Sequence, residues 1–180
     1  MNSAYKILPH YTYDNRLQWE GQWELIDGIP YAMSPSPAPR HQRVTAELRY
    51  EFMLALKRSN CRACSAYDPI DYKISDDTVL IPDILVVCGD IKKQYLDFAP
   101  ALVVEILSPS TALKDRNTKM QLYTQEKVRY YLIVDPDAEA IEIYLLTEGQ
   151  YRLQTFSDSF TFELQEGCSI DVKLNRVFNV

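Results

Sequence analysis

Long apolar runs are missing from this sequence. No segment approaches the ~20 consecutive apolar residues of a membrane-spanning helix, and the N-terminus lacks the basic, apolar and small-residue regions of a secretory signal peptide. Glycine is also scarce, with five residues, while 47% of the 180 residues are hydrophobic, which argues against a fibrous or disordered chain. We therefore expect a cytoplasmic protein with no membrane contact, folded as a single domain over residues 1–180.

An excess of positive charge is absent as well. Lys and Arg total 19 against 25 Asp and Glu, which gives a formal net charge of -6. Proteins that coat nucleic acid use bulk positive potential, so the charge argues against that class. A nuclease that holds acidic metal ligands in a cleft and concentrates its Lys and Arg locally is still compatible with this charge.

Histidine and cysteine are too sparse to indicate a zinc site. Only Cys61 and Cys64 have a suggestive spacing, and the two histidines, His10 and His41, are not arranged as the second ligand pair that zinc would need. We therefore predict reduced, structural thiols. The four cysteines are Cys61, Cys64, Cys88 and Cys168.

The first half of the chain predicts a hairpin followed by a long helix. Asp27-Gly28 between two apolar runs is a strong hairpin signal, because both turn positions need positive φ. The prolines of residues 34–39 predict an ordered loop, and apolar residues at helical spacing predict an amphipathic helix over residues 40–58. Weaker patterns indicate helical character over 11–20 and short strands over 62–67 and 70–74.

The second half predicts a sheet covered on both faces. The strand expected over 101–107 is apolar on both sides except for one acid, which is typical of a strand inside such a sheet. Residues 108–111 end it and offer Ser or Thr caps for a helix over 112–126. Further strands are expected over 79–87 and 130–134, followed by antiparallel hairpin segments over 140–146, 151–156, 160–164 and 170–172.

Two acids, Asp83 and Glu105, lie within these apolar strands. An unpaired ionised carboxylate in a dry interior costs several kcal/mol, and a metal ion would offset that cost. A few oxygen ligands with water completing the shell suit Mg²⁺ or Mn²⁺. The alternative is that each acid pairs with an arginine or caps a loop, as structural carboxylates often do.

The order of these elements and a series of short motifs resemble a known family. Pro82-Asp83 followed by Glu105-Ile106-Leu107 resembles the PD-(D/E)XK nuclease superfamily, and over residues 23–146 the chain is more closely similar to the Uma-two family of putative restriction endonucleases. This resemblance implies a restriction-endonuclease-like α/β (α+β) fold, with a mixed β-sheet flanked by helices and additional antiparallel hairpins at both ends. The motifs are Glu24-Leu25-Ile26-Asp27-Gly28, Met33-Ser34-Pro35, His41-Gln42, Pro82-Asp83-Ile84, residues 103–111, Asp115, Lys119, Tyr123 and residues 131–136.

The resemblance also implies a metal-dependent DNA endonuclease. The side chains of Asp83 and Glu105 and the backbone carbonyl of Ile106 would bind Mg²⁺ or Mn²⁺. Family habit further implies a homodimer, in which two sites address two DNA strands.

The catalytic lysine departs from the superfamily pattern. Its usual position, two residues after the acid, is Leu107, and the resemblance moves it to Lys119 on the following helix. There it would orient or help deprotonate the attacking water and stabilise developing charge. The other interpretation is that Asp115 and Lys119, four residues apart, form an ordinary surface pair.

Further candidates lie on the two predicted helices. His41 begins the first helix, where an N-terminus attracts anions, and Glu47 on the same helix is a candidate outer acid of the cleft. A lone His near a helix start is more often a hydrogen-bonded surface residue, and an exposed Glu in a helix needs no special explanation. Candidate phosphate contacts are Arg40, Arg43, Lys114 and Arg116.

Two other functions compete with a nuclease. One is a catalytically inactive nuclease-fold module that binds nucleic acid or a protein partner, which the net charge and Leu107 favour. The other is a metal-free structural protein in which arginines pair with Asp83 and Glu105. If the carboxylates of Asp83 and Glu105 faced opposite sides of the sheet, the nuclease hypothesis would be excluded.

Overall fold

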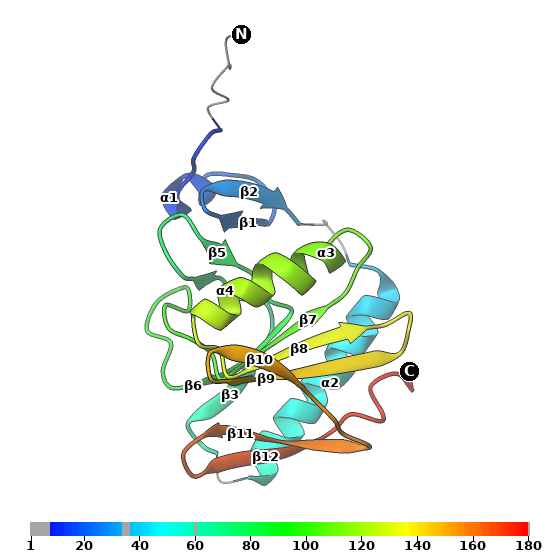
Figure 1. Cartoon of the computed structure of the whole chain (residues 1–180). Coiled ribbons are helices and arrows are strands. Elements are labelled where there is room, and N and C mark those ends of the chain that lie inside the picture. The colour runs from blue at the N-terminus through cyan, green and yellow to red at the C-terminus, as the bar shows by residue number, and fades with distance from the viewer. Residues whose placement is uncertain (1–7, 34–36, 60, 180) are drawn as a thin grey trace.

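A mixed sheet lies at the centre of the computed structural model, which describes residues 8–33, 37–59 and 61–179 (Figure 1). Its strands in the described ranges are β3 (Cys64–Tyr67), β6 (Ile84–Cys88), β7 (Leu102–Ile106), β8 (Tyr130–Asp135), β9 (Ala140–Thr147) and β10 (Gln150–Gln154). Their spatial order is β10-β9-β8-β7-β6-β3. Strands β7 and β8 pair in parallel and their neighbours pair antiparallel, so the expected mixed sheet is confirmed.

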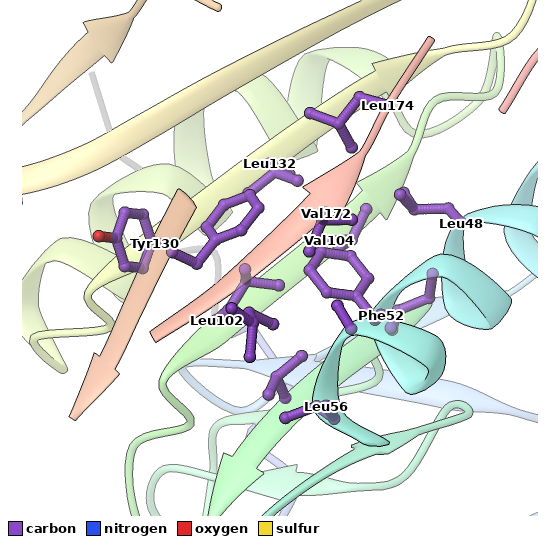
Figure 2. Packing of buried hydrophobic residues seen from close by; sticks show 14 of the residues in the cluster. Leu48, Phe52, Leu56, Leu102, Val104, Tyr130, Leu132, Val172 and Leu174 are labelled. Atoms are coloured by element: carbon purple, nitrogen blue, oxygen red, sulfur yellow. The ribbon is translucent and has the colours of Figure 1, made fainter. Parts of the chain in front are cut away.

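One face of the central sheet packs against the helix α2 (Pro39–Arg58) and the hairpin of β11 (Ser159–Gln165) and β12 (Cys168–Lys173). Figure 2 shows Phe52 of α2 beside Val104 of β7 and Val172 of β12. The ring of Phe52 also lies 5.6 Å from that of Phe162, measured between centroids. Alternate residues of β7 enter this core, which leaves Glu105 on the opposite face.

The other face is covered by a helical segment that the sequence predicted as one helix. It consists of α3 (Ala112–Lys114), the π-helical turn η1 (Asp115–Lys119) and α4 (Met120–Gln125). Tyr123 packs against Tyr131 of β8, with ring centroids 5.0 Å apart. The side chains of Asp115, Lys119 and Tyr123 are all buried, so this segment turns two charged residues toward the sheet.

A smaller antiparallel sheet lies beyond this helical segment, next to the short helix α1 (Tyr13–Arg16) (Figure 1). In the order β2-β1-β5-β4 it contains β2 (Ile29–Ala32), β1 (Trp23–Ile26), β5 (Val79–Leu80) and β4 (Tyr72–Lys73). Asp27 and Gly28 have φ values of 49° and 74°, which confirms the predicted hairpin turn. A side chain at position 28 would also collide with the ring of His10.

The prediction of a single strand over residues 79–87 is wrong. The chain leaves the smaller sheet after β5 and enters the central sheet at β6, with Pro82 between the two. Proline has no N–H to donate to a strand ladder, so the strand is interrupted there. Asp83 therefore stands at the entrance of β6 rather than inside a continuous strand.

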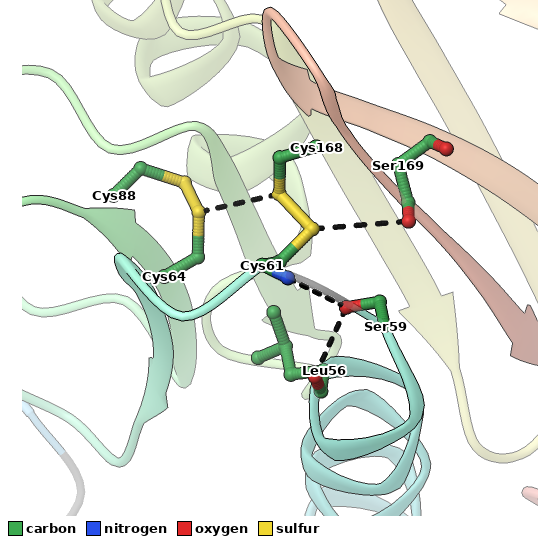
Figure 3. The surroundings of a disulfide bond; sticks show 7 residues. All are labelled: Leu56, Ser59, Cys61, Cys64, Cys88, Cys168 and Ser169. Atoms are coloured by element: carbon green, nitrogen blue, oxygen red, sulfur yellow. Dashed lines mark hydrogen bonds between the residues drawn. A yellow bond between two sulfur atoms is a disulfide. The ribbon is translucent and has the colours of Figure 1, made fainter.

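The predicted free thiols are also wrong. Cys61 pairs with Cys168 and Cys64 with Cys88 as disulfides (Figure 3). Cys64 and Cys88 face each other in the β3–β6 register, whereas Cys168 is 107 residues from Cys61 in the sequence. Only the folded chain brings these partners together, so spacing did not reveal the pairs.

Residues 34–36 of the predicted proline loop lie outside the described residues. Within the described ranges, no helix is both long and apolar enough to cross a membrane.

Replacing Phe52 with alanine tests the packing of α2. Phe52 is fully buried, so we expect Phe52→Ala to lower the free energy of unfolding by about 3–5 kcal/mol, through lost burial and a residual cavity. Tyr50 on the same helix is 57% exposed, so Tyr50→Ala should change stability by about 0.5 kcal/mol or less. Urea unfolding measures both, and equal effects would contradict the orientation of α2.

Candidate functional site

A cleft of about 430 Å³ lies where β6 begins and β7 ends. The residues predicted for catalysis, Asp83, Glu105 and Lys119, all line it. So do His41 and Ile106. The structure thus brings together residues from α2, the β5–β6 connection, β7 and η1, which are far apart in the sequence.

Asp83 and Glu105 lie on the same face of the central sheet. Ile84 of β6 pairs with Val104 of β7 in antiparallel register, so the next pair outward places Asp83 opposite Glu105. Side chains directly opposite each other share one face, with Cβ atoms roughly 4.5–5.5 Å apart. Oδ2 of Asp83 accepts a hydrogen bond of 2.7 Å from the backbone N–H of Ile106, which holds the aspartate at the strand end. Asp83 and Glu105 therefore do not face opposite sides of the sheet, which is the arrangement that would exclude a shared metal.

Lys119 is surrounded by three carboxylates. Its Nζ atom lies 2.8 Å from Oε1 of Glu24, 2.9 Å from Oε1 of Glu105 and 3.4 Å from Oδ1 of Asp115. Lys119 and Asp115 are 2% and 1% exposed, so the interpretation of these two residues as a surface pair is wrong. From η1 the ammonium reaches Glu105 although Leu107, at the usual lysine position, holds no charge.

Glu24 belongs to this cluster, and the sequence interpretation gave it no role. It lies in β1 with no exposed surface, and its carboxylate accepts a 3.0 Å hydrogen bond from the N–H of Ile81. Its second oxygen is bonded by the ammonium of Lys114. One pattern could have revealed it: like Glu105, Glu24 is a lone acid in an apolar strand.

The surroundings favour the ionised forms of Glu24 and Lys119 but not that of Glu105. Burial favours the neutral form of Glu24, but the lysines Lys119 and Lys114 and the N–H of Ile81 outweigh it, so its pKa lies below the ordinary value. Burial raises the pKa of Glu105, Lys119 opposes this, and nearby acids reinforce it, so its pKa lies well above the ordinary value. Burial also opposes charge on Lys119, but Glu105, Glu24 and Asp115 raise its pKa. Glu24 is therefore the ionised partner of Lys119. A further cation beside Glu105 would favour the ionised form of Glu105.

His41 lies in the first turn of α2 and faces the ends of both strands. Its Nε2 atom is 3.1 Å from the carbonyl oxygen of Ile106 and 3.5 Å from Oδ1 of Asp83. Burial disfavours the imidazolium, but the contacts with Asp83 and with the Ile106 carbonyl outweigh burial and raise the pKa of His41. Because one nitrogen reaches both oxygens, the Asp83 carboxylate and the Ile106 carbonyl face a common point.

The oxygen atoms beside the two strand ends are of the kind that a hard divalent cation binds. Carboxylates of Asp83 and Glu105 and the carbonyl of Ile106 are donors that Mg²⁺ and Mn²⁺ prefer, with water completing the shell. Oδ1 of Asp115 is also buried without a hydrogen bond. Among the described residues, no group of three or more His, Cys, Asp or Glu side chains is arranged to hold a metal ion. The ligand set for a divalent ion would therefore combine two carboxylate side chains with one backbone carbonyl.

Two of the four predicted phosphate contacts reach the cleft. Arg40 and Lys114 line it, but both are engaged: Arg40 donates to the carbonyl of Pro136 at 2.8 Å and pairs with Glu139 at 2.6 Å, and Lys114 pairs with Glu24. A phosphate would have to compete with these partners.

Three other candidates are not among the residues that line the cleft. Arg43 is exposed and Glu47 is half-buried on α2. Arg116 pairs with Glu142 of β9 at 2.6 Å. The geometry gives these residues no part in the chemistry at Glu105.

Comparisons with known proteins agree with this architecture. Residues 11–175 match the sequence model of the Uma2 family, which is described as a putative restriction endonuclease. An uncharacterized protein of Synechocystis sp., slr1290, is 28% identical over 165 residues, covering 87% of this chain and 86% of that protein. A crystal structure from Anabaena variabilis, described as a putative nuclease belonging to DUF820, has a TM-score of 0.73 at 18% identity. It covers 93% of this chain and 97% of that chain. The restriction-endonuclease-like fold expected from the sequence is confirmed.

Removing the charge of Lys119 tests the buried cluster. We expect Lys119→Met to lower the free energy of unfolding by roughly 3–5 kcal/mol at neutral pH, because it leaves the carboxylate of Glu24 buried without its main partner. Lys92 is exposed, so Lys92→Met is the matched control and should have little effect. Guanidinium unfolding gives both values, and equal stabilities of the two variants would refute the buried cluster.

Proposed function

Because the chain belongs to the Uma2 family of putative restriction endonucleases, we propose that it is a Mg²⁺- or Mn²⁺-dependent endonuclease that hydrolyses phosphodiester bonds of DNA. The family supports a hydrolytic nuclease; the metal and the DNA substrate belong to this proposal. The observation that carries it is the placement of Asp83 and Glu105 on one face of the sheet with Lys119 beside Glu105.

Asp83, Glu105 and the carbonyl of Ile106 would hold the divalent ion. When bound, such an ion neutralises charge on the scissile phosphate and lowers the pKa of a coordinated water. Tyr123 assists by donating a 2.7 Å hydrogen bond to Oε1 of Glu105, which fixes the orientation of that carboxylate. The same oxygen contacts Lys119, so the other oxygen of Glu105 is left for the ion.

Lys119 would act on the attacking water and on developing charge at the phosphate. Its ammonium is held between Glu24 and Glu105 in a buried position, where a fixed charge stabilises a transition state more strongly than in water. Glu24 and Asp115 also line the cleft, and their ion pairs hold this lysine in place. Lys119 thus takes the role of the superfamily lysine from a different element.

His41, Arg40 and Lys114 would meet the DNA backbone. His41 sits in the first turn of α2, where unpaired backbone N–H groups favour an anion. Its nitrogen already lies beside Asp83 and Ile106, so a phosphate next to the metal ion would be within its reach. Arg40 and Lys114 line the same cleft and would exchange their present partners for phosphate oxygens.

A binding module without catalysis is the second candidate function. Two observations favour it: the net charge of -6, and the engagement of Arg40 and Lys114 in ion pairs within the protein. Such a module would bind nucleic acid or a protein partner in the same cleft but leave DNA uncut when metal is supplied.

We also propose that the protein acts as a cytoplasmic, single-domain homodimer. Two copies would let two clefts address the two strands of a duplex. The dimer and the location are predictions from the family resemblance and from the sequence composition, respectively.

Cleavage of supercoiled plasmid DNA with Mn²⁺ tests the proposed reaction. We expect the wild-type chain to nick or linearise the plasmid, and Asp83→Asn, Glu105→Gln and Lys119→Met each to reduce the rate by roughly a hundredfold or more, because each removes a metal ligand or the buried cation. Chelation of the metal should abolish cleavage.

Glu166→Gln serves as the control for this assay, since Glu166 is exposed in the turn between β11 and β12. It should cleave like the wild type. Cleavage that survives in both Asp83→Asn and Glu105→Gln would remove the assignment, and a folded wild type that binds DNA without cutting it would favour the binding module.

A further inference from the structure

We propose that the four cysteines form a zinc site when they are reduced, so that the two disulfides are the oxidised form of a four-thiolate Zn²⁺ centre. This inference does not depend on the proposed nuclease activity. The residues concerned lie away from the cleft and do not line it.

The four sulfur atoms are already gathered in one place. The Cys61–Cys168 and Cys64–Cys88 bonds lie side by side, and Sγ of Cys64 is 3.6 Å from Sγ of Cys168, although these two atoms are not bonded to each other (Figure 3). In a tetrahedral centre with Zn–S distances of about 2.3 Å, the sulfurs are separated by roughly 3.8 Å. The unbonded pair therefore already has the spacing of two thiolates on one zinc ion.

The backbone around these sulfurs is well fixed. Cys61 and Cys64 form a Cys-x-x-Cys turn, closed by a 3.1 Å hydrogen bond from the N–H of Cys64 to the carbonyl of Cys61. Cys88 lies opposite Cys64 in the β3–β6 ladder, and Cys168 is the first residue of β12. A Cys-x-x-Cys turn joined by two thiols from neighbouring strands is a common way to complete a structural zinc site.

Three of the four cysteines are buried. Cys61, Cys64 and Cys168 are between 4% and 6% exposed. Reduction of the two disulfides would leave four thiols packed together. Zinc binds thiolates and stabilises their ionised form, and it would tie the β11–β12 hairpin and the end of α2 to the central sheet as the disulfides do.

The two forms interconvert by oxidation with a small-molecule disulfide. Two molecules of that oxidant accept the four electrons that the thiolates release. Four Zn–S bonds break, two protein S–S bonds form, Zn²⁺ leaves, and the oxidant is released as four thiolates. Reduction by a dithiol in the presence of Zn²⁺ reverses the change.

Titration with Co²⁺, a spectroscopic substitute for zinc, tests the proposal. The full chain is reduced with a phosphine, freed of reductant under nitrogen and titrated. We expect one Co²⁺ per chain with sulfur-to-cobalt charge-transfer absorption, displaced by one equivalent of Zn²⁺. Oxidised protein should show none of this absorption.

Variants separate this site from other metal sites. Cys88→Ser and Cys168→Ser should weaken the Co²⁺ binding that gives this absorption by roughly a hundredfold or more, whereas Ser169→Ala, next to Cys168 and exposed, should bind like the wild type. X-ray absorption of the zinc-loaded wild type should show four sulfur neighbours, a measurement that does not rely on the variants folding.

Three results would overturn the proposal. The first is reduced, folded protein that binds neither Co²⁺ nor Zn²⁺ at micromolar concentration. The second is a zinc ion with nitrogen or oxygen neighbours in place of sulfur. The third is binding that Asp83→Asn abolishes, which would assign the metal to the cleft.

Discussion

The ammonium group of Lys119 is the contact on which the arrangement of the site depends. It joins Glu24 of the smaller sheet, Glu105 of the central sheet and Asp115 of its own helical turn. Each of these acids is almost fully buried, and buried carboxylates without a partner are strongly destabilising. The same lysine that stabilises these acids in the folded chain also holds them in the lining of the cleft. Stability and the proposed chemistry therefore rely on one charge. The acids outnumber the cations around Glu105, and this imbalance is what a divalent ion would correct.

Local patterns predicted the main elements because those elements depend on local chemistry. Asp27-Gly28 adopts the positive φ values that its hairpin needs, and the apolar spacing of α2 and of β7 matches the faces that they bury. Two features were not predicted from the sequence because they depend on tertiary context. Pro82 divides one apolar run between two sheets, and the helical segment after β7 contains a π turn that periodicity does not reveal.

The candidate site was predictable only in part. Asp83 and Glu105 stood out as acids in apolar strands, and the register places them opposite each other. Glu24 has the same sequence pattern, but its partnership with Lys119 joins residues 95 positions apart and needed the fold. The cysteines show the same limit, since Cys168 meets Cys61 across 107 residues. Pairing of charges and of thiols over such separations is set by topology rather than by spacing.

Binding of Mn²⁺ to the protein with its disulfides intact tests the central claim most directly. In that form the thiols cannot compete for metal, so electron paramagnetic resonance of free Mn²⁺ reports the cleft alone. The arrangement of Asp83, Glu105 and the Ile106 carbonyl predicts one bound Mn²⁺ per chain, with affinity reduced by roughly tenfold or more in Asp83→Asn. Equal binding by the wild type and Asp83→Asn, or no binding by either, would contradict a shared metal between these two strands.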